Sequence, residues 1–148
     1  MTEQTDKQRR IVVGVDGSPS SIDALRWAVD QARVRGAVIE AVTAWRYPVA
    51  TDWTVPVVAD ENLADSARKV LDEAIAEATG AEHRGGILAR VMEGGAVSCL
   101  LDAARGAELL VVGSRGHGGF TGALLGSVSQ HCVQHAPCPV VVVRHPNN

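Results

Sequence analysis

The sequence has few aromatic residues, almost no lysine and few cysteines, and each shortage excludes a class of protein. Aromatic residues make up 3% of the 148 residues, so aliphatic side chains must supply most of any core. Lysine occurs only at Lys7 and Lys69. The three cysteines, Cys99, Cys132 and Cys138, contain no CxxC pair, which argues against a disulfide scaffold and favours a reducing compartment.

A long apolar run and an excess of positive charge are also missing. No apolar run approaches the roughly 20 residues that span a bilayer. Residues 1–10 are polar and charged, unlike a signal peptide, so we expect a cytoplasmic protein without a membrane partner. The net charge of −3 and pI near 5.9 offer no electrostatic footprint for DNA or RNA, so we expect no nucleic-acid partner.

Apolar segments and turn residues alternate along the chain in a way that predicts a single α/β domain. Strands are predicted at 11–15, 38–45, 87–92, 109–112 and 138–143. Helices are predicted from Ser20 or Ser21 to Gly36, over 63–80, from Gly94 to about Gly106, and from Gly126 to His135. Crossovers of this length connect parallel strands with a right-handed turn and place helices on both faces of the sheet. We take residues 1–10 as a polar lead-in and 11–144 as the domain.

The segment from Gly113 to Ser129 carries the clearest sign of a ligand site. Its glycines are too dense for a strand or a helix, and it joins the end of one strand to the start of a helix. Glycine lets the backbone approach a ligand closely, and N–H groups in a loop and at a helix N-terminus suit an anion. The segment therefore predicts a phosphate-binding loop, and the alternative is a turn that only connects two elements.

Two common nucleotide-binding loops are absent from the sequence. There is no GxxxxGK[ST] motif, and the run from Gly14 to Gly17 does not continue as GxGxxG. No lysine lies within the glycine-rich segment to reach a phosphate. These observations exclude a P-loop NTPase and a Rossmann dehydrogenase.

The spacing Gly113-x2-Gly116-x9-Gly126-Ser127 resembles the G-2x-G-9x-G-[S/T] motif of the universal stress protein (UspA-like) family, in its ATP-binding branch. The run 12–18 is similar to the first strand and aspartate of that family, and residues 112–116 and 137–140 also match. The likeness extends from Arg10 to Arg144.

The resemblance implies an adenine nucleotide alpha hydrolase-like fold, an open parallel five-stranded sheet of order 3-2-1-4-5 with helices on both faces. In that order the winding reverses between strands one and four, and ligands of such sheets bind beyond the strand ends at this point. Asp16 and Gly113 follow or end those two strands. The predicted motif and the implied topology therefore agree.

The resemblance also implies which residues contact the nucleotide. Gly14, Val15 and Asp16 would lie on the adenine and ribose side, and main-chain groups near Thr43 would contact the adenine edge. The ribose and phosphates would be surrounded by Gly113, Arg115, Gly116, Gly126, Ser127 and Val128, with Ser129 as a further candidate. The expected ligand is ATP, with or without Mg²⁺, and cyclic AMP is the alternative.

Several of these residues have a second interpretation that needs no ligand. An aspartate after a strand often hydrogen-bonds its own turn, so Asp16 can serve the turn, the ligand or both. Arg115 can pair with a phosphate or be a solvated loop residue, and for His117 a solvent-facing position is favoured. Trp45, Tyr47 and Trp53 can cover the base or pack the long loop over 46–60 onto the domain.

A cluster of histidines and cysteines near the C-terminus raises the question of a zinc site. His131 and His135 are one helical turn apart, with Cys132 and Cys138 nearby. We favour a structural role, because Cys132 can face the core while His131 faces water, and free cysteine is commonly a small buried hydrophobe. We therefore predict no metal site.

Three classes of function follow from these features. The first is an ATP-binding regulatory or protective protein of the stress response, because the loop supplies no base for water and no second carboxylate joins Asp16 to hold a metal. The second is a slow ATPase switch. The third is an interaction module, since an apolar edge strand over Val140–Val143 is prone to pair with another chain. The family pairs this strand across a homodimer, and we predict the same here.

Overall fold

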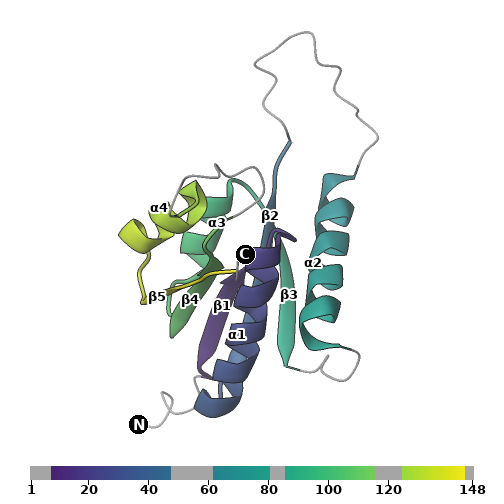
Figure 1. The fold of residues 1–148 in the computed structure, drawn as a ribbon. Helices are drawn as coiled ribbons and strands as arrows, with labels where there is room; N and C mark the ends of the chain where they lie inside the picture. The colour runs from purple at the N-terminus through teal and green to yellow at the C-terminus, as the bar shows by residue number, and fades with distance from the viewer. Residues whose placement is uncertain (1–7, 48–61, 81–85, 116–124, 146–148) are drawn as a thin grey trace.

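The computed structural model describes residues 8–47, 62–80, 86–115 and 125–145, and these form one parallel sheet between two layers of helices (Figure 1). The five strands follow the order β3-β2-β1-β4-β5, which confirms the predicted topology. The strands are β1 (Arg10–Gly14), β2 (Val38–Trp45), β3 (Ile87–Glu93), β4 (Leu109–Gly113) and β5 (Val140–Val143). The helices are α1 (Pro19–Arg35), α2 (Leu63–Thr79), α3 (Ala96–Ala103) and α4 (Ser127–His135).

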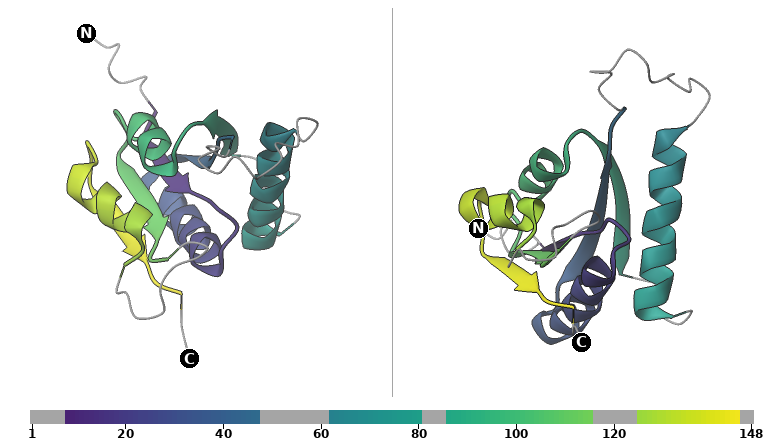
Figure 2. Two further views of the ribbon diagram at one scale, coloured as in Figure 1. Left: turned by 90° about the horizontal axis from the view of Figure 1, so that it is seen from above. Right: turned by 45° about the horizontal axis from the view of Figure 1, so that its top comes forward.

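Helices α1 and α2 cover one face of the sheet, and α3 and α4 cover the other (Figure 2). Because successive side chains of a strand point to opposite faces, β1 directs Ile11 and Val13 toward α1 and α2 but Val12 toward α3 and α4. All three side chains are fully buried. This burial on both faces explains why the central strands consist of continuous aliphatic runs without alternating polar residues.

Helix α1 begins earlier than the sequence predicted. Its N-cap is Ser18, whose side chain accepts a hydrogen bond from the Ser21 N–H at 3.2 Å, so Ser20 and Ser21 are not the cap. The Ser21 hydroxyl instead donates to the Ser18 carbonyl at 3.0 Å. Pro19 occupies the first helical position, where its missing N–H costs no helical hydrogen bond. The helix ends at Gly36, which has φ 67°, as predicted.

The fifth strand is shorter than predicted. It starts at Val140, and Cys138 and Pro139 precede it. The Pro139 carbonyl still accepts a hydrogen bond from the Leu110 N–H at 2.9 Å, but proline has no N–H with which to continue the ladder. The other boundaries differ from the predicted ones by a few residues at most.

Glu40 is a charged residue in the otherwise apolar β2 and is buried beside two arginines. Its carboxylate oxygens accept hydrogen bonds from Arg10 and Arg90, each at 2.8 Å. Arg10 also donates to the carbonyls of Ala103 and Arg105, each at 2.7 Å, at the end of α3. The arrangement ties α3 to β1 and β2 and neutralises the one buried carboxylate among the described residues.

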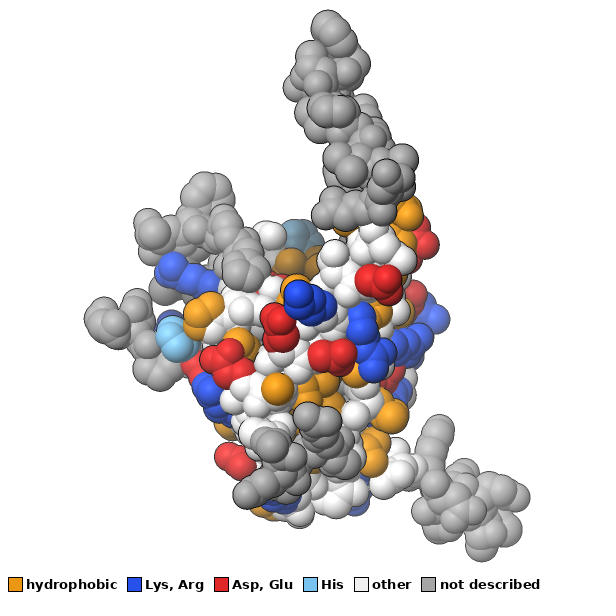
Figure 3. Space-filling model, turned by 90° about the vertical axis from the view of Figure 1, so that its right-hand side faces the viewer, with side chains coloured by type: hydrophobic (Ala, Val, Ile, Leu, Met, Phe, Trp, Pro, Cys, Tyr) orange, Lys and Arg blue, Asp and Glu red, His pale blue; other side chains and the backbone are white. Residues whose placement is uncertain are grey.

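The outer surface of the α2 side carries both signs of charge. Figure 3 shows acidic and basic side chains interspersed on this face. One such pair is Arg68 and Asp72, 3.2 Å apart and one helical turn apart on α2. Within the described residues, no helix combines the length and apolar character needed to cross a bilayer.

Candidate functional site

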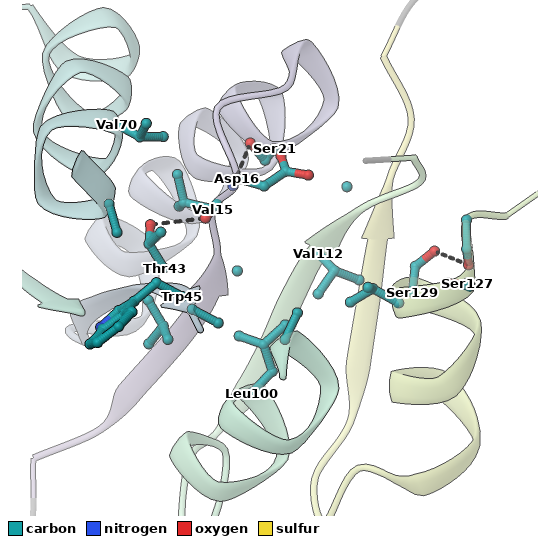
Figure 4. Close-up of a pocket in the computed structure, with 18 of the residues that line it drawn as sticks. Val15, Asp16, Ser21, Thr43, Trp45, Val70, Leu100, Val112, Ser127 and Ser129 are labelled. Atoms are coloured by element: carbon teal, nitrogen blue, oxygen red, sulfur yellow. Dashed lines mark hydrogen bonds between the residues drawn. The ribbon is translucent and has the colours of Figure 1, made fainter. Parts of the chain in front are cut away.

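A cavity of about 660 Å³ lies at the carboxyl ends of the strands, between β1, β2 and β4 and the helices around them (Figure 4). Its size is ordinary for a small-molecule site. The site residues predicted from the sequence line it wherever the structure describes them; Gly116 lies outside the described residues. The predicted residues on its wall are Gly14, Val15, Asp16, Thr43, Gly113, Arg115, Gly126, Ser127, Val128 and Ser129.

The strand order places the cavity where the winding of the chain reverses. β1 and β4 are neighbours in the sheet, but β1 leads into α1 on one face and β4 leads toward α4 on the other. The segments that follow β1 and β4 therefore leave the sheet in opposite directions, and a crevice opens between them beyond the strand ends. Gly14, Val15 and Asp16 therefore line the same cavity as Gly113 and Arg115, although the two segments are far apart in the sequence.

Asp16 belongs both to its own turn and to the cavity wall. One carboxylate oxygen accepts a hydrogen bond from the Ser18 N–H at 2.9 Å, which is the turn-stabilising role considered above. The side chain is nevertheless exposed, and Figure 4 shows it leaving the turn on the side that faces β4. The two interpretations of Asp16 are compatible, because the turn holds the carboxylate in place at the cavity.

The Thr43 hydroxyl is used inside the protein. It donates to the Val15 carbonyl at 2.9 Å, and Thr43 is only 5% exposed (Figure 4). The Val15 N–H in turn donates to the Val42 carbonyl at 2.8 Å. These bonds fasten the end of β1 to β2 and leave the side chain of Thr43 without a hydroxyl proton for a ligand.

Ala44 presents its main chain to the cavity beyond the end of β1. Successive residues of a strand direct their N–H and C=O groups to opposite edges. The Val42 carbonyl bonds toward β1, whereas the Trp45 carbonyl accepts from the Gly94 N–H on the β3 side. Ala44 therefore faces the β1 side, where β1 has already ended, and it lines the cavity. Main-chain groups near Thr43 were expected at the site, and among the described residues Ala44 lines the cavity beside Thr43.

The N-terminus of α4 opens into the cavity without a side-chain cap. Its N-cap is Gly126, with φ −70° and ψ 165°, and this residue has no side chain to accept a hydrogen bond from the N–H groups of the first turn. The first intrahelical bond runs from the Gln130 N–H to the Gly126 carbonyl at 3.0 Å. The preceding N–H groups of Ser127, Val128 and Ser129 are donors that an α-helix cannot satisfy itself, so they can bind an anion.

The four helices differ in how their N-termini are capped. In α1 and α2 the side chains of Ser18 and Asn62 accept hydrogen bonds from the first turn. In α3 and α4 the N-caps are Gly95 and Gly126, which have no side chain to do so. The first residues of the two helices with glycine caps, Ala96 and Ser127, both line the cavity, as does Leu63 at the start of α2.

The charged residues on the cavity wall favour a negatively charged ligand. Among the described residues, Arg46 and Arg115 are the arginines that line the cavity, and Asp16 is the carboxylate. The Arg115 carbonyl accepts a hydrogen bond from the Ser18 hydroxyl at 3.3 Å, which fixes the start of the glycine-rich segment against the β1–α1 turn. His117 lies outside the described residues.

Helix α2 forms a second wall of the cavity, which was not predicted from the sequence. Leu63, Ser66, Ala67 and Val70 line the cavity from this helix. They follow helical spacing, but such a pattern equally describes a helix that only packs on a sheet. Which apolar positions face a cavity depends on how far α2 stands from the end of β2, and local sequence does not encode that distance.

The two described aromatic residues at the end of β2, Trp45 and Tyr47, have different positions relative to the cavity. Trp45 lines the cavity, whereas Tyr47 is 57% exposed and contacts Trp45 edge to face with ring centroids 5.3 Å apart. Trp53 lies outside the described residues. Of the described pair, Trp45 can therefore contact a ligand, whereas Tyr47 packs against the Trp45 ring.

The histidine and cysteine cluster is divided between surface and core. Cys132 is fully buried, and burial raises the pKa of its thiol to about 11. His131 and His135 are exposed and stack with ring centroids 6.4 Å apart. Within the described residues, no three histidine, cysteine or acidic side chains gather to hold a metal ion. Cys132 serves as a core residue.

The family model and the similar curated proteins all point to the same protein family. Residues 7–144 match the model of the Universal stress protein family. The chain is 36% identical over 138 residues to a universal stress protein of Mycobacterium tuberculosis strain H37Rv, a match that covers 90% of this chain and 46% of the relative. The chain thus spans about half the length of the curated relatives it matches.

Solved structures are similar over the whole described fold. A universal stress protein solved in complex with cAMP is 29% identical, with a TM-score of 0.69, and the match covers 94% of this chain and 98% of that one. The universal stress protein UspA from Lactobacillus plantarum is 22% identical, with a TM-score of 0.66 and coverage of 93% and 99%. At that level of identity, the second likeness concerns the fold alone.

Proposed function

This chain belongs to the universal stress protein family, and from that premise we propose that it binds an adenine nucleotide, ATP in the first place, as a regulatory or protective module of the stress response. The observation that carries the proposal is the pairing of two features across one cavity. On one side lies the uncapped N-terminus of α4, and on the other lie the main-chain groups of Ala44. The proposed ligand has an anionic end and a flat polar edge to match them.

The base would lie at the end of β2. The Watson–Crick edge of adenine offers an amino donor beside a ring-nitrogen acceptor, which complement the C=O and N–H of a single residue such as Ala44. Apolar side chains on the cavity wall, among them Val15, Val70 and Leu100, can enclose the rings. The ribose would then lie over Gly14, with its hydroxyl groups within reach of the Asp16 carboxylate.

The phosphates would lie at the N-terminus of α4. Three main-chain N–H groups, the positive end of the helix dipole and the Ser127 hydroxyl are the proposed donors. Among the described residues the Ser127 hydroxyl makes no hydrogen bond, so it is available to a phosphate oxygen. Arg115 supplies positive charge on the same wall, and Gly116 would belong to the same phosphate-binding loop.

We propose binding without efficient turnover. Asp16 is the one carboxylate among the described lining residues, so a Mg²⁺ ion would be held mainly by the phosphates and water. Hydrolysis would also need a base to orient water. A slow ATPase switch is the second candidate, and cyclic AMP is the second candidate ligand, because the protein of known structure with 29% identity was solved with cAMP.

Calorimetric titration of nucleotide-free protein with ATP, cyclic AMP and GTP tests this function. We expect ATP to bind with a micromolar Kd, and GTP to bind at least tenfold more weakly because its base presents a different edge. A Kd for cyclic AMP below that for ATP would reverse the ligand assignment. Absence of binding by either adenine nucleotide at millimolar concentration would overturn the proposal, and single-turnover hydrolysis within minutes would favour the ATPase.

We also propose a homodimer formed through β5, in the cytoplasm that the free cysteines favour. The strand is at the edge of the sheet, and its four valines are only partly buried. The Leu110 N–H bonds to the Pro139 carbonyl and the Ser114 N–H to the Val143 carbonyl, so by alternation Val140 and Val142 direct their main-chain groups outward. A second copy can pair with this outward edge.

Substitution of one outward residue tests the dimer. Val142→Pro removes an N–H that bonds nothing in β4, and proline is tolerated at such edge positions. Sedimentation equilibrium at micromolar concentration should give a dimer for the wild type and a monomer with native circular dichroism for Val142→Pro. A wild-type monomer, or a Val142→Pro dimer of unchanged affinity, would contradict pairing through β5.

A further inference from the structure

The two ends of the glycine-rich segment are joined at its base by Ser114, Gly126 and Ser129. The Gly126 N–H donates to the Ser114 carbonyl at 2.7 Å. The Ser129 hydroxyl lies 3.2 Å from the same carbonyl and 3.1 Å from the Gly126 carbonyl, and Ser129 is only 3% exposed. One buried hydroxyl therefore contacts both the end of β4 and the N-cap of α4.

This contact decides what the Ser129 side chain can do for a bound anion. A hydroxyl has a single proton, and that of Ser129 is shared between two carbonyl oxygens. An ionised phosphate only accepts hydrogen bonds, so a side chain without a spare proton has nothing to donate to it. The Ser127 hydroxyl, which bonds to none of the described residues, is in the opposite situation.

We propose that Ser129 is a positioning residue, whose side chain fixes the angle between the end of β4 and the first turn of α4. This inference rests on the proposed function, since the first turn carries the N–H groups assigned to the phosphates. The direction of those N–H groups relative to Asp16 and Ala44 depends on how α4 leaves β4. The hydroxyl links the two and acts on the ligand through the backbone.

Removal of the hydroxyl leaves every backbone bond of the region in place. The Ser114 carbonyl keeps the Gly126 N–H, and the Gly126 carbonyl keeps the Gln130 N–H at 3.0 Å. Alanine is also a better helix former than serine. Ser129→Ala should therefore fold normally and lose only the restraint between helix and strand, which separates positioning from stability.

Helix α3 provides a matched control. The run from Gly95 to Ser98 reads Gly-Ala-Val-Ser, and the run from Gly126 to Ser129 reads Gly-Ser-Val-Ser. Ser98 thus occupies the same place after a glycine N-cap, but it is exposed and forms no hydrogen bond with the described residues. Ser98→Ala makes the same chemical change without removing a cross-link.

The test measures Kd for ATP, adenosine and tripolyphosphate in the wild type, Ser129→Ala, Ser129→Thr and Ser98→Ala. For Ser129→Ala we expect about tenfold weaker binding of ATP and tripolyphosphate, the equivalent of one hydrogen bond, with adenosine unchanged. Ser129→Thr, which keeps a hydroxyl able to bond a carbonyl in the preceding turn, should restore affinity. Ser98→Ala and the urea unfolding midpoint of Ser129→Ala should match the wild type.

Two results would overturn the positioning role. One is unchanged ATP affinity in Ser129→Ala, and the other is an equal loss for ATP and adenosine, which would indicate a general structural effect. Failure of the proposed function is recognised separately in the wild type. If the wild-type protein binds tripolyphosphate but neither ATP nor adenosine, the adenine assignment is wrong. The Kd values for tripolyphosphate in the wild type and the variants then still decide the role of Ser129. If the wild-type protein binds none of the three, both proposals are wrong.

Discussion

Replacing Gly126 with aspartate is expected to weaken ATP binding strongly while leaving the protein at least as stable as the wild type. The N-cap has φ −70° and ψ 165°, a conformation open to any residue. An aspartate there would accept the N–H groups of the first turn with its own carboxylate, which typically adds a few tenths of a kcal/mol over glycine. The same carboxylate would occupy the proposed phosphate position and repel the nucleotide. We expect Kd for ATP to rise by roughly 100-fold or more.

The matched control is Gly95→Asp at the N-cap of α3. Gly95 has nearly the same conformation, with φ −69° and ψ 150°, and a Cβ there would lie 3.3 Å from Nη1 of the flexible Arg46 side chain. This variant adds the same charge at the other uncapped helix of the cavity. If the phosphates bind at α4, calorimetry should show a much smaller loss for Gly95→Asp than for Gly126→Asp. The reverse order would assign the phosphates to α3.

Replacing Gly113 with alanine is expected to destabilise the whole domain. A Cβ at this position would lie 2.6 Å from both the carbonyl carbon and Cβ of Ser20, and 2.8 Å from the Ser20 oxygen. Two of those three atoms belong to the backbone of α1, which cannot move aside without shifting the helix on the sheet. We expect a loss of about 3 kcal/mol in the free energy of unfolding, the upper part of the usual range for overpacking.

Urea unfolding of Gly113→Ala and of Gly95→Ala measures this effect. In Gly95→Ala the added Cβ contacts only the end of the Arg46 side chain, so the free energy of unfolding should change by less than about 0.5 kcal/mol. Equal stability of the two variants would show that α1 can move away from β4 with little loss in the free energy of unfolding. The expected result has a practical consequence, because a loss of ATP binding in a Gly113 variant would report unfolding, whereas one in a Gly126 variant reports the site.

The fold was predictable because each element carries its own signals in the sequence. Buried parallel strands require unbroken aliphatic runs such as Ile11–Val13, and glycines such as Gly36 and Gly80 end the helices that follow. The exact start of α1 was not predictable. Three serines at 18, 20 and 21 all suit an N-cap, and the choice of Ser18 depends on the turn that Asp16 makes before it.

The sequence also predicted many of the residues that line the cavity, but it did not predict the hydrogen bonds that their side chains make. Glycine spacing and strand ends placed Asp16 and Gly126 on one cavity. In contrast, the hydroxyls of Thr43 and Ser129 turned out to be bonded to carbonyls of Val15, Ser114 and Gly126, contacts made by residues that the fold brings together. The α2 wall and Arg46 were missed for the same reason, since no local pattern distinguishes a residue that lines a cavity from one that packs a core.

The glycine caps of α3 and α4 have a consequence for the lifetime of the protein. A helix that lacks a side-chain cap leaves its first N–H groups to water or to a bound anion, so an anion that binds there would add to the stability of the native state from outside the chain. By mass action, a ligand at 100 times its Kd adds about 2.7 kcal/mol to the free energy of unfolding. Because proteases act on the opened state, degradation of such a protein would slow as nucleotide accumulates and quicken as it is depleted. The amount of protein in a cell would then follow the supply of its ligand.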